Sequence, residues 1–295
     1  AGFKNNEITS LQTYEQIQTF YDLHSNPNDP DAPLAFKNFD VNANISRSTL
    51  NRGTFPSAGS SQQLSFKMTT PNSSDVQYFK INLDSKFYFP ITRDQKWTVL
   101  ARLELGYGNG YGDVNGNDQI LPFWENFRAG GSDSLRGFEN YTVGPRAVYR
   151  YPTPIGGTPD LTGGSACCLG ADQDYIQVSP RSVGGNAIVV GGVELIVPTP
   201  FLDESYANSV RTSLFVDVGN VWDTEFNFAD YQDLAPVEFE KLADYSDAGR
   251  YRASGGLSIQ WLSPMGPMIF NFAKTIKVEE DDDTAFFSFN IGKTF

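Results

Sequence analysis

Apolar and polar side chains alternate residue by residue through long stretches of this chain. Within residues 76–89 the odd positions are mainly apolar, whereas the even positions include Lys80, Asp84 and Lys86. Side chains of a β-strand point to opposite faces in turn, so this period of two predicts strands with one apolar and one polar face. The pattern predicts further strands around 39–45, 64–68, 97–107, 189–197, 214–218, 257–261, 270–272 and 287–295, and the end of a tenth within 1–9.

Two all-β classes fit this alternation: a soluble β-sandwich with an aromatic core, and an antiparallel transmembrane β-barrel. Several predicted strands run for about ten residues, the length that a tilted strand needs to cross a bilayer core of ~30 Å. The connections alternate between short and long, as in outer-membrane barrels, whose short turns are periplasmic. The barrel is therefore favoured, with a periplasmic C-terminus. Aromatic residues near strand ends, where a membrane interface would lie, are Phe87, Phe89, Trp97, Tyr107, Trp222, Trp261 and Phe295.

Composition argues against several other functions. The formal net charge is −13, and a nucleic-acid binder would need a basic surface, so we expect no nucleic-acid partner. No nucleophile–base pair, metal-ligand cluster or cofactor-binding loop is visible, so we expect no enzyme, no catalytic residue, no metal and no cofactor. The acidic run 279–283 fits either a divalent-cation site or a solvated loop. Cys167 and Cys168 are adjacent, which strains a disulfide between them, so reduced thiols or another partner are favoured.

One connection, residues 110–185, is far longer than an ordinary hairpin loop. Its first part is rich in aromatic residues and glycines, so we expect it to fold back into the barrel lumen. Glu194 and Asp217 lie on neighbouring predicted strands, with the parity opposite to the lipid-facing residues, so both should point into that lumen. Two close carboxylates favour a cation between them, and the loop's Arg136 is the candidate. The alternative is that both acids merely hydrate a polar lumen.

Residues 130–138, preceded by 121–127, resemble the VRGF-containing loop of the BamA family of outer-membrane protein insertases, with Leu135 in place of the usual valine. The resemblance implies a 16-stranded barrel, of which residues 1–295 would be the C-terminal nine to ten strands, with loop 110–185 inserted into the lumen. It also implies that the first six strands and the periplasmic POTRA domains are absent from this chain. Further similar segments are 50–56, 140–146, 183–187, 198–201, 206–212, 221–224, 260–267 and 289–295.

The same resemblance implies roles for individual residues. In that family the loop is anchored in the lumen, and the last strand meets the first at a weak lateral seam. Glycine at an inward bend of the last strand fits its lack of a side chain. The loop-anchoring network would comprise Arg136, Gly137, Phe138, Glu194 and Asp217. The C-terminal seam strand would include Phe289, Ile291, Gly292 and Phe295.

The implied function is that of an insertase, which catalyses folding and insertion of client β-barrels at the seam without covalent chemistry. Its partners would be nascent outer-membrane β-barrel proteins, assembly-complex lipoproteins, and outer-membrane lipids with lipopolysaccharide. Its location would be the bacterial outer membrane. A polypeptide-secreting outer-membrane channel of the same superfamily is the alternative, because such channels share the RGF loop.

Overall fold

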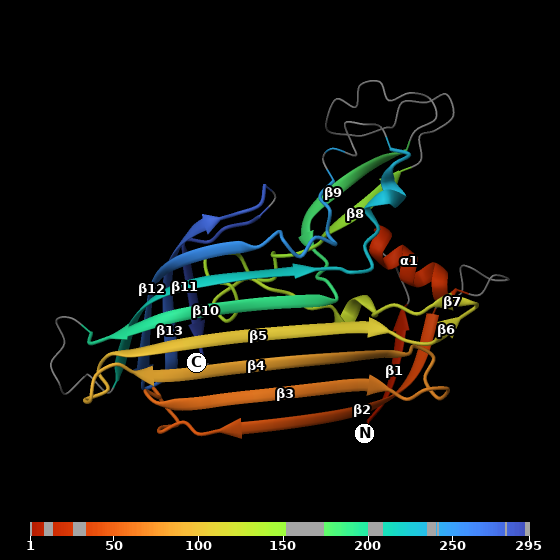
Figure 1. Cartoon of the computed structure of the whole chain (residues 1–295). Helices are drawn as coiled ribbons and strands as arrows, with labels where there is room; N and C mark the ends of the chain where they lie inside the picture. The colour runs from red at the N-terminus through yellow and green to blue at the C-terminus, as the bar shows by residue number, and fades with distance from the viewer. Residues whose placement is uncertain are drawn as a thin grey trace.

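Ten antiparallel strands form one curved sheet in the computed structural model of this protein (Figure 1). The structure describes residues 2–8, 14–25, 34–151, 174–199, 209–234, 240, 242–280 and 282–292. Consecutive strands of the sheet pair as neighbours, and β5 pairs with β10 across the long connection. The predicted all-β, antiparallel fold is confirmed. In order, the strands are β1 (Gly2–Ile8), β2 (Leu34–Ser48), β3 (Gly59–Thr69), β4 (Tyr78–Pro90), β5 (Thr98–Gly110), β10 (Ala187–Val197), β11 (Val210–Trp222), β12 (Arg252–Ser263), β13 (Gly266–Lys277) and β14 (Phe287–Ile291).

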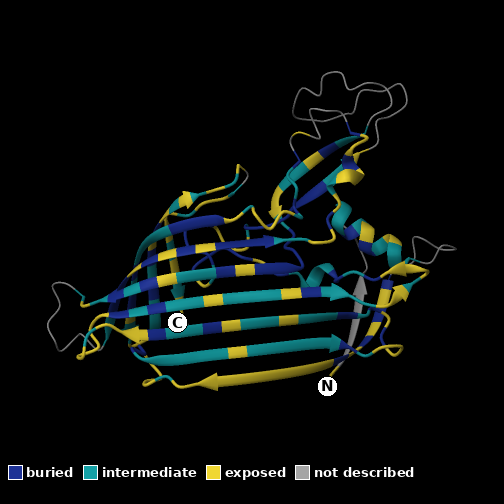
Figure 2. Cartoon of the chain, viewed as in Figure 1, coloured by how far each residue is buried: buried dark blue, intermediate teal, exposed yellow. Residues whose placement is uncertain are grey.

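The two faces of the sheet differ as the alternation predicts. On β11, Val216 and Val218 are exposed on the outer face, whereas Asp217 between them is buried on the concave face, which we call the lumen. Figure 2 shows the same alternation of buried and exposed positions along β10 and β11. A contiguous outer band of exposed apolar side chains is stable only in an apolar environment. No helix in the described part of the chain is long and apolar enough to cross a membrane.

The sheet has two edges within the part of the chain that the structure describes. At one edge β1 pairs with residues 34–40 of β2, and the exposed residues 41–48 extend beyond it. At the other edge β14 pairs with residues 268–272 of β13. Backbone hydrogen bonds continue this ladder on both sides, from the Ala273 amide to the Phe286 carbonyl and from the Gly292 amide to the Pro267 carbonyl. Unpaired strand edges are costly in lipid, so both edges call for further partners.

The long connection between β5 and β10 divides into two parts. Its first part contains β6 (Asp113–Val114), β7 (Asn117–Asp118) and the short helix η1 (Phe123–Glu125), and continues through residues 127–143 against the lumen wall. Its second part, β8 (Arg146–Tyr151) and β9 (Tyr175–Ser182), forms a hairpin that extends beyond the end of the sheet (Figure 1). The prediction of one lumenal loop over 110–185 did not foresee this hairpin.

A second small core explains why the β8–β9 hairpin lies outside the lumen. Val148 and Ile176 of the hairpin pack against apolar residues of the β11–β12 connection, which also contains the short helix η2 (Phe228–Tyr231). The helix α1 (Glu15–His24) contacts β8. The apolar partners from the β11–β12 connection are Phe226, Tyr231, Leu234, Leu242 and Tyr245.

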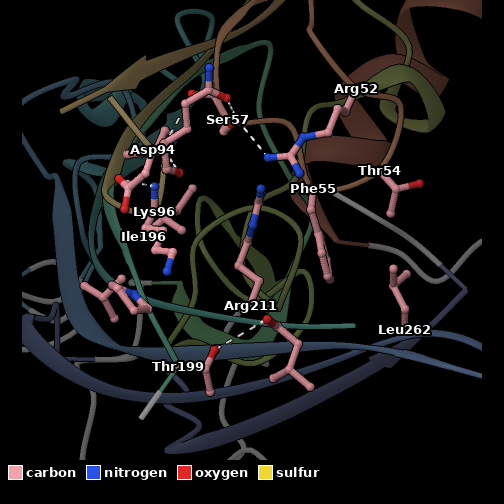
Figure 3. Close-up of a pocket in the computed structure, with 15 residues that line it drawn as sticks. Arg52, Thr54, Phe55, Ser57, Asp94, Lys96, Ile196, Thr199, Arg211 and Leu262 are labelled. Carbon is pink, nitrogen blue, oxygen red and sulfur yellow. Dashed lines mark hydrogen bonds between the residues drawn. The ribbon is translucent and has the colours of Figure 1, made fainter. Parts of the chain in front are cut away.

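The short turns lie together at the other end of the sheet. The β2–β3 turn curls inward, so that Phe55 is buried, and it encloses a cavity together with the β4–β5 turn (Figure 3). The lumen is therefore filled by the long connection toward one end and bordered by this cavity at the other.

Candidate functional site

A row of four residues crosses the lumen wall in register. Arg102 of β5 is opposite Gly192 of β10, which is opposite Asp217 of β11, which is opposite Ser254 of β12. A Cβ at Gly192 would lie 2.3 Å from Asp217 Oδ1 and 2.8 Å from Arg102 Nε. The glycine therefore leaves the space through which Arg102 reaches across β10, and its Nη2 lies 2.7 Å from Asp217 Oδ2.

Arg136 enters this row from the long connection. Its Nε and Nη2 donate to Asp217 Oδ2 and Oδ1 at 2.7 and 2.8 Å, and its Nη1 lies 2.7 Å from Glu194 Oε1. The side chains of all three are at most 1% exposed. The guanidinium carbon of Arg136 lies 3.6 Å from the centroid of the Phe215 ring, and Ser213 Oγ donates to Glu194 Oε2 at 3.0 Å. One guanidinium thus joins two strands of the wall to the loop.

The charges of this cluster balance. Burial by itself would lower the pKa of Arg136, but Glu194 and Asp217 outweigh that effect and raise its pKa. Arg102 supplies the second cation, and its Nη2 also donates to the Ser134 carbonyl of the loop at 2.6 Å. Buried charges are tolerated when they are paired and hydrogen-bonded, and these two cations and two anions meet that condition.

Gly137 and Phe138 continue the loop along the wall. Gly137 has a φ of +90°, and a Cβ there would lie 3.0 Å from Ser254 Cβ and 3.3 Å from Ala273 Cβ. Ser254 Oγ donates a hydrogen bond to the Arg136 carbonyl. Phe138 is buried in an apolar cluster that joins the loop to β10 and β11, and its other members are Phe127, Ala129, Leu135, Val143, Ile188, Val190 and Val221.

The start of the same segment is anchored separately on β3 and β4. Glu125 in η1 forms an ion pair with Lys67 of β3, and Tyr78 Oη of β4 donates to its carboxylate at 3.2 Å. Lys80 Nζ lies 4.2 Å from the centroid of the Phe127 ring. The loop is therefore anchored to strands from β3 to β12. Arg136 binds β10 and β11, toward the β12 end of this series.

The loop also pairs with the connection between β13 and β14. The Glu139 amide donates to the Asp283 carbonyl at 2.9 Å, and the Ala285 amide donates to the Gly137 carbonyl at 3.0 Å. These two backbone hydrogen bonds flank the Gly137–Phe138 dipeptide, whose Gly137 packs on Ser254. The residues resembling the RGF motif thus contact both the wall and the last hairpin.

One polar side chain of the edge strand itself reaches the loop. Asn290 of β14 donates through Nδ2 to Asp133 Oδ1 at 2.8 Å and to Ser132 Oγ at 3.2 Å. The edge strand β14 is therefore held from the lumen side by the loop.

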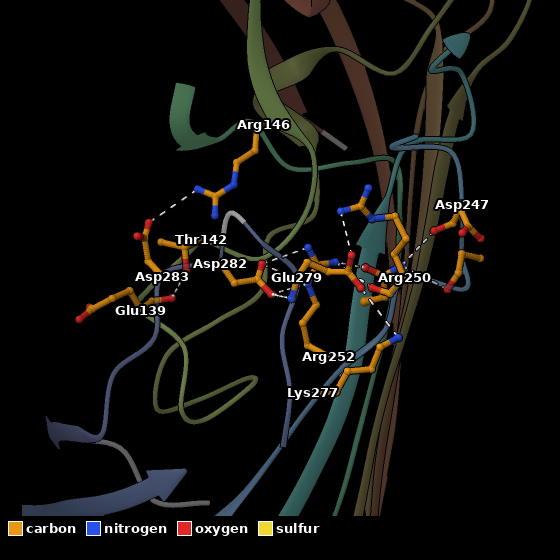
Figure 4. Close-up of polar contacts among 12 residues, drawn as sticks. Glu139, Thr142, Arg146, Asp247, Arg250, Arg252, Lys277, Glu279, Asp282 and Asp283 are labelled. Atoms are coloured by element: carbon orange, nitrogen blue, oxygen red, sulfur yellow. Dashed lines mark hydrogen bonds and ion pairs between the residues drawn. The ribbon is translucent and has the colours of Figure 1, made fainter. Parts of the chain in front are cut away.

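Three acids of the run 279–283, namely Glu279, Asp282 and Asp283, contact arginines (Figure 4). Arg252 of β12 binds both Asp282 carboxylate oxygens, and its Nη1 donates to Asn220 Oδ1 at 2.7 Å. These contacts fix the β13–β14 connection at its turn. Among the described residues, the ion pairs of the run are Arg252 with Asp282 at 3.0 Å, Arg250 with Glu279 at 3.0 Å, Arg146 with Asp283 at 3.7 Å, and Lys277 with Glu279 at 3.8 Å.

The structure brings the predicted loop and wall residues into one cluster: Arg136, Gly137, Phe138, Glu194 and Asp217. Phe289 and Ile291 lie on the exposed outer face of β14, and Gly292 follows with a φ of +91°. Phe295, Cys167 and Cys168 lie outside the described residues. The sequence analysis missed further members of the cluster, namely Arg102, Ser213, Ser254 and Asn290.

The inward direction of Arg102 and Asn290 could be read from alternation, since both occupy the polar parity of their strands. Their partners could not, because alternation says nothing about which loop atom lies above a given wall residue. For Ser213 and Ser254, the sequence indicates only the face of the strand on which each side chain lies.

Comparison with known proteins agrees with this geometry. Residues 1–295 match the model of the Omp85 superfamily domain. The outer membrane protein assembly factor BamA of Neisseria meningitidis serogroup B is 28% identical over 257 residues, which are 84% of this chain and 28% of that protein. The crystal structure of BamA from Haemophilus ducreyi lacking POTRA domains 1-3 is similar with a TM-score of 0.79 and 30% identity, over 97% of this chain and 49% of that chain. This chain spans less than half the length of either relative. Because the family model matches it from end to end, the protein belongs to the Omp85 superfamily.

Proposed function

We propose that this chain is the C-terminal part of an outer-membrane insertase, which helps client β-barrels to fold and insert at the edge of strand β14. The observation that carries the proposal is the state of that edge. Within the described residues, strand β14 ends the sheet with β13 as its one neighbouring strand, and it is held on its lumen side by Asn290. Both similar proteins are named BamA, and one of them is named an outer membrane protein assembly factor.

The chemistry of this function is strand addition and involves no covalent step. An extended client segment can pair with the free backbone groups of an edge strand, and alternate side chains then set its register. Phe289 and Ile291 would face lipid beside the client, because they are exposed on the outer face. An edge strand that is paired on one side is easier to displace than a strand that is paired on both sides.

The lumen cluster has a positioning role in this proposal. Arg136 ties the loop to Glu194 and Asp217, and the loop in turn contacts the β13–β14 connection and Asn290. The cluster therefore holds the edge strand in place without touching a client. In this arrangement the short turns and the C-terminus face the periplasm. Nascent barrel proteins, assembly lipoproteins and outer-membrane lipids with lipopolysaccharide would be the partners.

Reconstitution of the full-length protein in lipid vesicles tests the function. An insertase should accelerate folding of an unfolded client barrel, measured as the appearance of a heat-modifiable, faster-migrating band on a gel. Empty vesicles and vesicles with an unrelated barrel are the controls. A polypeptide-secreting channel would instead leave the folding rate unchanged and give conductance that depends on its substrate, and that result would reject the insertase proposal.

The contact between Asn290 and Asp133 yields a specific prediction. N290A removes two hydrogen bonds, to Asp133 and Ser132, that each contribute about 1 kcal/mol, so the amides of β14 should exchange with deuterium about thirtyfold faster. The D133A variant removes one of these two bonds from the loop side and should give about fivefold faster exchange. The double variant should be no faster than N290A, because N290A already removes the bond to Asp133.

Hydrogen exchange read by mass spectrometry over 286–292 checks this coupling. S288A is the control, since Ser288 bonds to Asn271 within the hairpin and not to the loop. Additive effects of N290A and D133A would show that the loop does not hold the edge strand through this contact.

A further inference from the structure

A second site lies at the turn end of the lumen, away from the Arg136 cluster. The cavity between the β2–β3 turn, the β4–β5 turn and the ends of β10 and β11 has a volume of about 530 Å³ (Figure 3). Three cationic side chains and one acid line it, although the chain as a whole has a net charge of −13. The charged lining residues are Arg52, Asp94, Lys96 and Arg211.

Arg211 is a buried cation in this cavity. It is 8% exposed, its Nη2 donates to the Pro56 carbonyl at 2.6 Å, and its guanidinium carbon lies 4.8 Å from the centroid of the Phe55 ring. Tyr88 and Glu194 are among its titratable neighbours, and the ion pair of Glu194 is with Arg136. Within the described chain, no carboxylate forms an ion pair with Arg211.

A second guanidinium adds to this positive charge. Arg52 Nη2 donates to Ser57 Oγ at 2.9 Å, on the residue next to Pro56, whose carbonyl accepts the hydrogen bond from Arg211. Figure 3 shows both side chains directed toward the middle of the cavity. Like Arg211, Arg52 has no carboxylate partner among the residues that the structure describes. Two converging guanidiniums, one of them buried, are unfavourable unless an anion lies between them.

The turn that carries Arg52 is built to hold a fixed shape. Asn51 Oδ1 accepts hydrogen bonds from the amides of Ser57 and Ala58 at 3.1 and 3.2 Å. Phe55 has a φ of +48°, which is uncommon for a residue with a side chain, and its ring is buried beside Arg211. Backbone strain of this kind persists where the surroundings enforce it and is concentrated at ligand sites.

We propose that this cavity is a binding site for a phosphate group, held by Arg52 and Arg211 with Lys96 at its rim. A planar guanidinium offers paired donors that match phosphate oxygens, and a phosphate carries enough charge to balance two arginines. The phosphate comes either from solution or from an anionic lipid headgroup. The inference does not depend on the insertase function, because it uses none of the residues that hold the loop or the edge strand.

Titration of the full-length protein in detergent with inorganic phosphate and pyrophosphate tests the site. Binding is measured by isothermal calorimetry against chloride at equal ionic strength. R52Q and R211Q should each weaken binding at least tenfold. R93Q is the matched control, because Arg93 is an exposed cation in the β4–β5 turn that does not line the cavity, and it should bind as the unaltered protein does.

A parallel arm uses nanodiscs of phosphatidylcholine with or without phosphatidylglycerol and measures lipid retained with the protein after detergent extraction. The site is supported if, in either arm, R52Q and R211Q bind more weakly than the unaltered protein while R93Q does not. The arm in which this difference appears identifies the source of the phosphate. R52Q keeps the test decisive if R211Q fails to fold, since Arg52 is exposed. No binding in either arm, or equal weakening by R93Q, would overturn the proposal.

Discussion

R136A should destabilise the sheet more than any other single truncation in the lumen. The change leaves Glu194 and Asp217 buried, with Arg102 as the one cation still contacting Asp217 in the described cluster. Removing one partner of a buried ion pair costs about 3–5 kcal/mol, because the remaining charge stays in a poorly solvated place. The free energy of unfolding, measured from the loss of the heat-modifiable band with urea, should fall by that amount. Residues 121–144 should also become sensitive to protease.

Two further variants separate charge from packing in this experiment. R136K keeps one positive charge but loses the bidentate geometry, so its loss should be intermediate. The triple variant R136M/E194Q/D217N removes all three charges and should recover part of the stability that R136A loses, because no carboxylate is left unpaired. Unchanged urea stability and unchanged protease sensitivity in R136A would show that the loop is held by its apolar contacts instead.

G137A should detach the loop from β12 and β13 while leaving every charge in place. The new Cβ would lie 3.0 Å from Ser254 Cβ and 3.3 Å from Ala273 Cβ, and both of these atoms are fixed to strands of the wall. The φ of +90° adds backbone strain to this steric conflict. We expect a loss of about 2–4 kcal/mol in the free energy of unfolding, together with faster hydrogen exchange at the Ala285 amide, which bonds to the Gly137 carbonyl.

G116A is the matched control for G137A. Gly116 has a similar φ of +81°, but no atom lies within 4 Å of the position of its Cβ. Its replacement therefore reports the backbone strain alone, and it should leave exchange at Ala285 unchanged. If G116A and G137A lower the free energy of unfolding equally, the close approach of the loop to Ser254 and Ala273 contributes nothing.

The strands of this protein were predictable because their signal is local. Burial of one face of each strand makes apolar and polar side chains alternate with a period of two. This alternation can be recognised in any stretch of about ten residues. It correctly indicated that Glu194 and Asp217 are buried and that Val193 and Val216 face outward. The separation of short turns from long connections followed from the same reading, because each strand reverses the direction of the chain.

The long connection was less predictable. Its aromatic residues indicated burial, but the sequence did not distinguish burial in the lumen from burial in a separate core. Residues 127–143 pack on β10 and β11, whereas Val148 and Ile176 pack on the β11–β12 connection outside the sheet. Both environments are apolar, so composition is the same in each, and only the geometry of the connections decides between them.

Alternation and residue type were therefore enough to predict the main strands, the face that each side chain occupies, and Arg136 as a suitable cation for two inward carboxylates. The stagger of the strands follows only from their packing, and it places Arg102, Gly192, Asp217 and Ser254 in one row under the loop. The tertiary structure also decided that the loop contacts Asn290 of the edge strand. The physical reason is that alternation repeats every two residues and is unchanged when two strands slide past each other by two, so the pattern alone leaves the neighbours of each side chain undetermined.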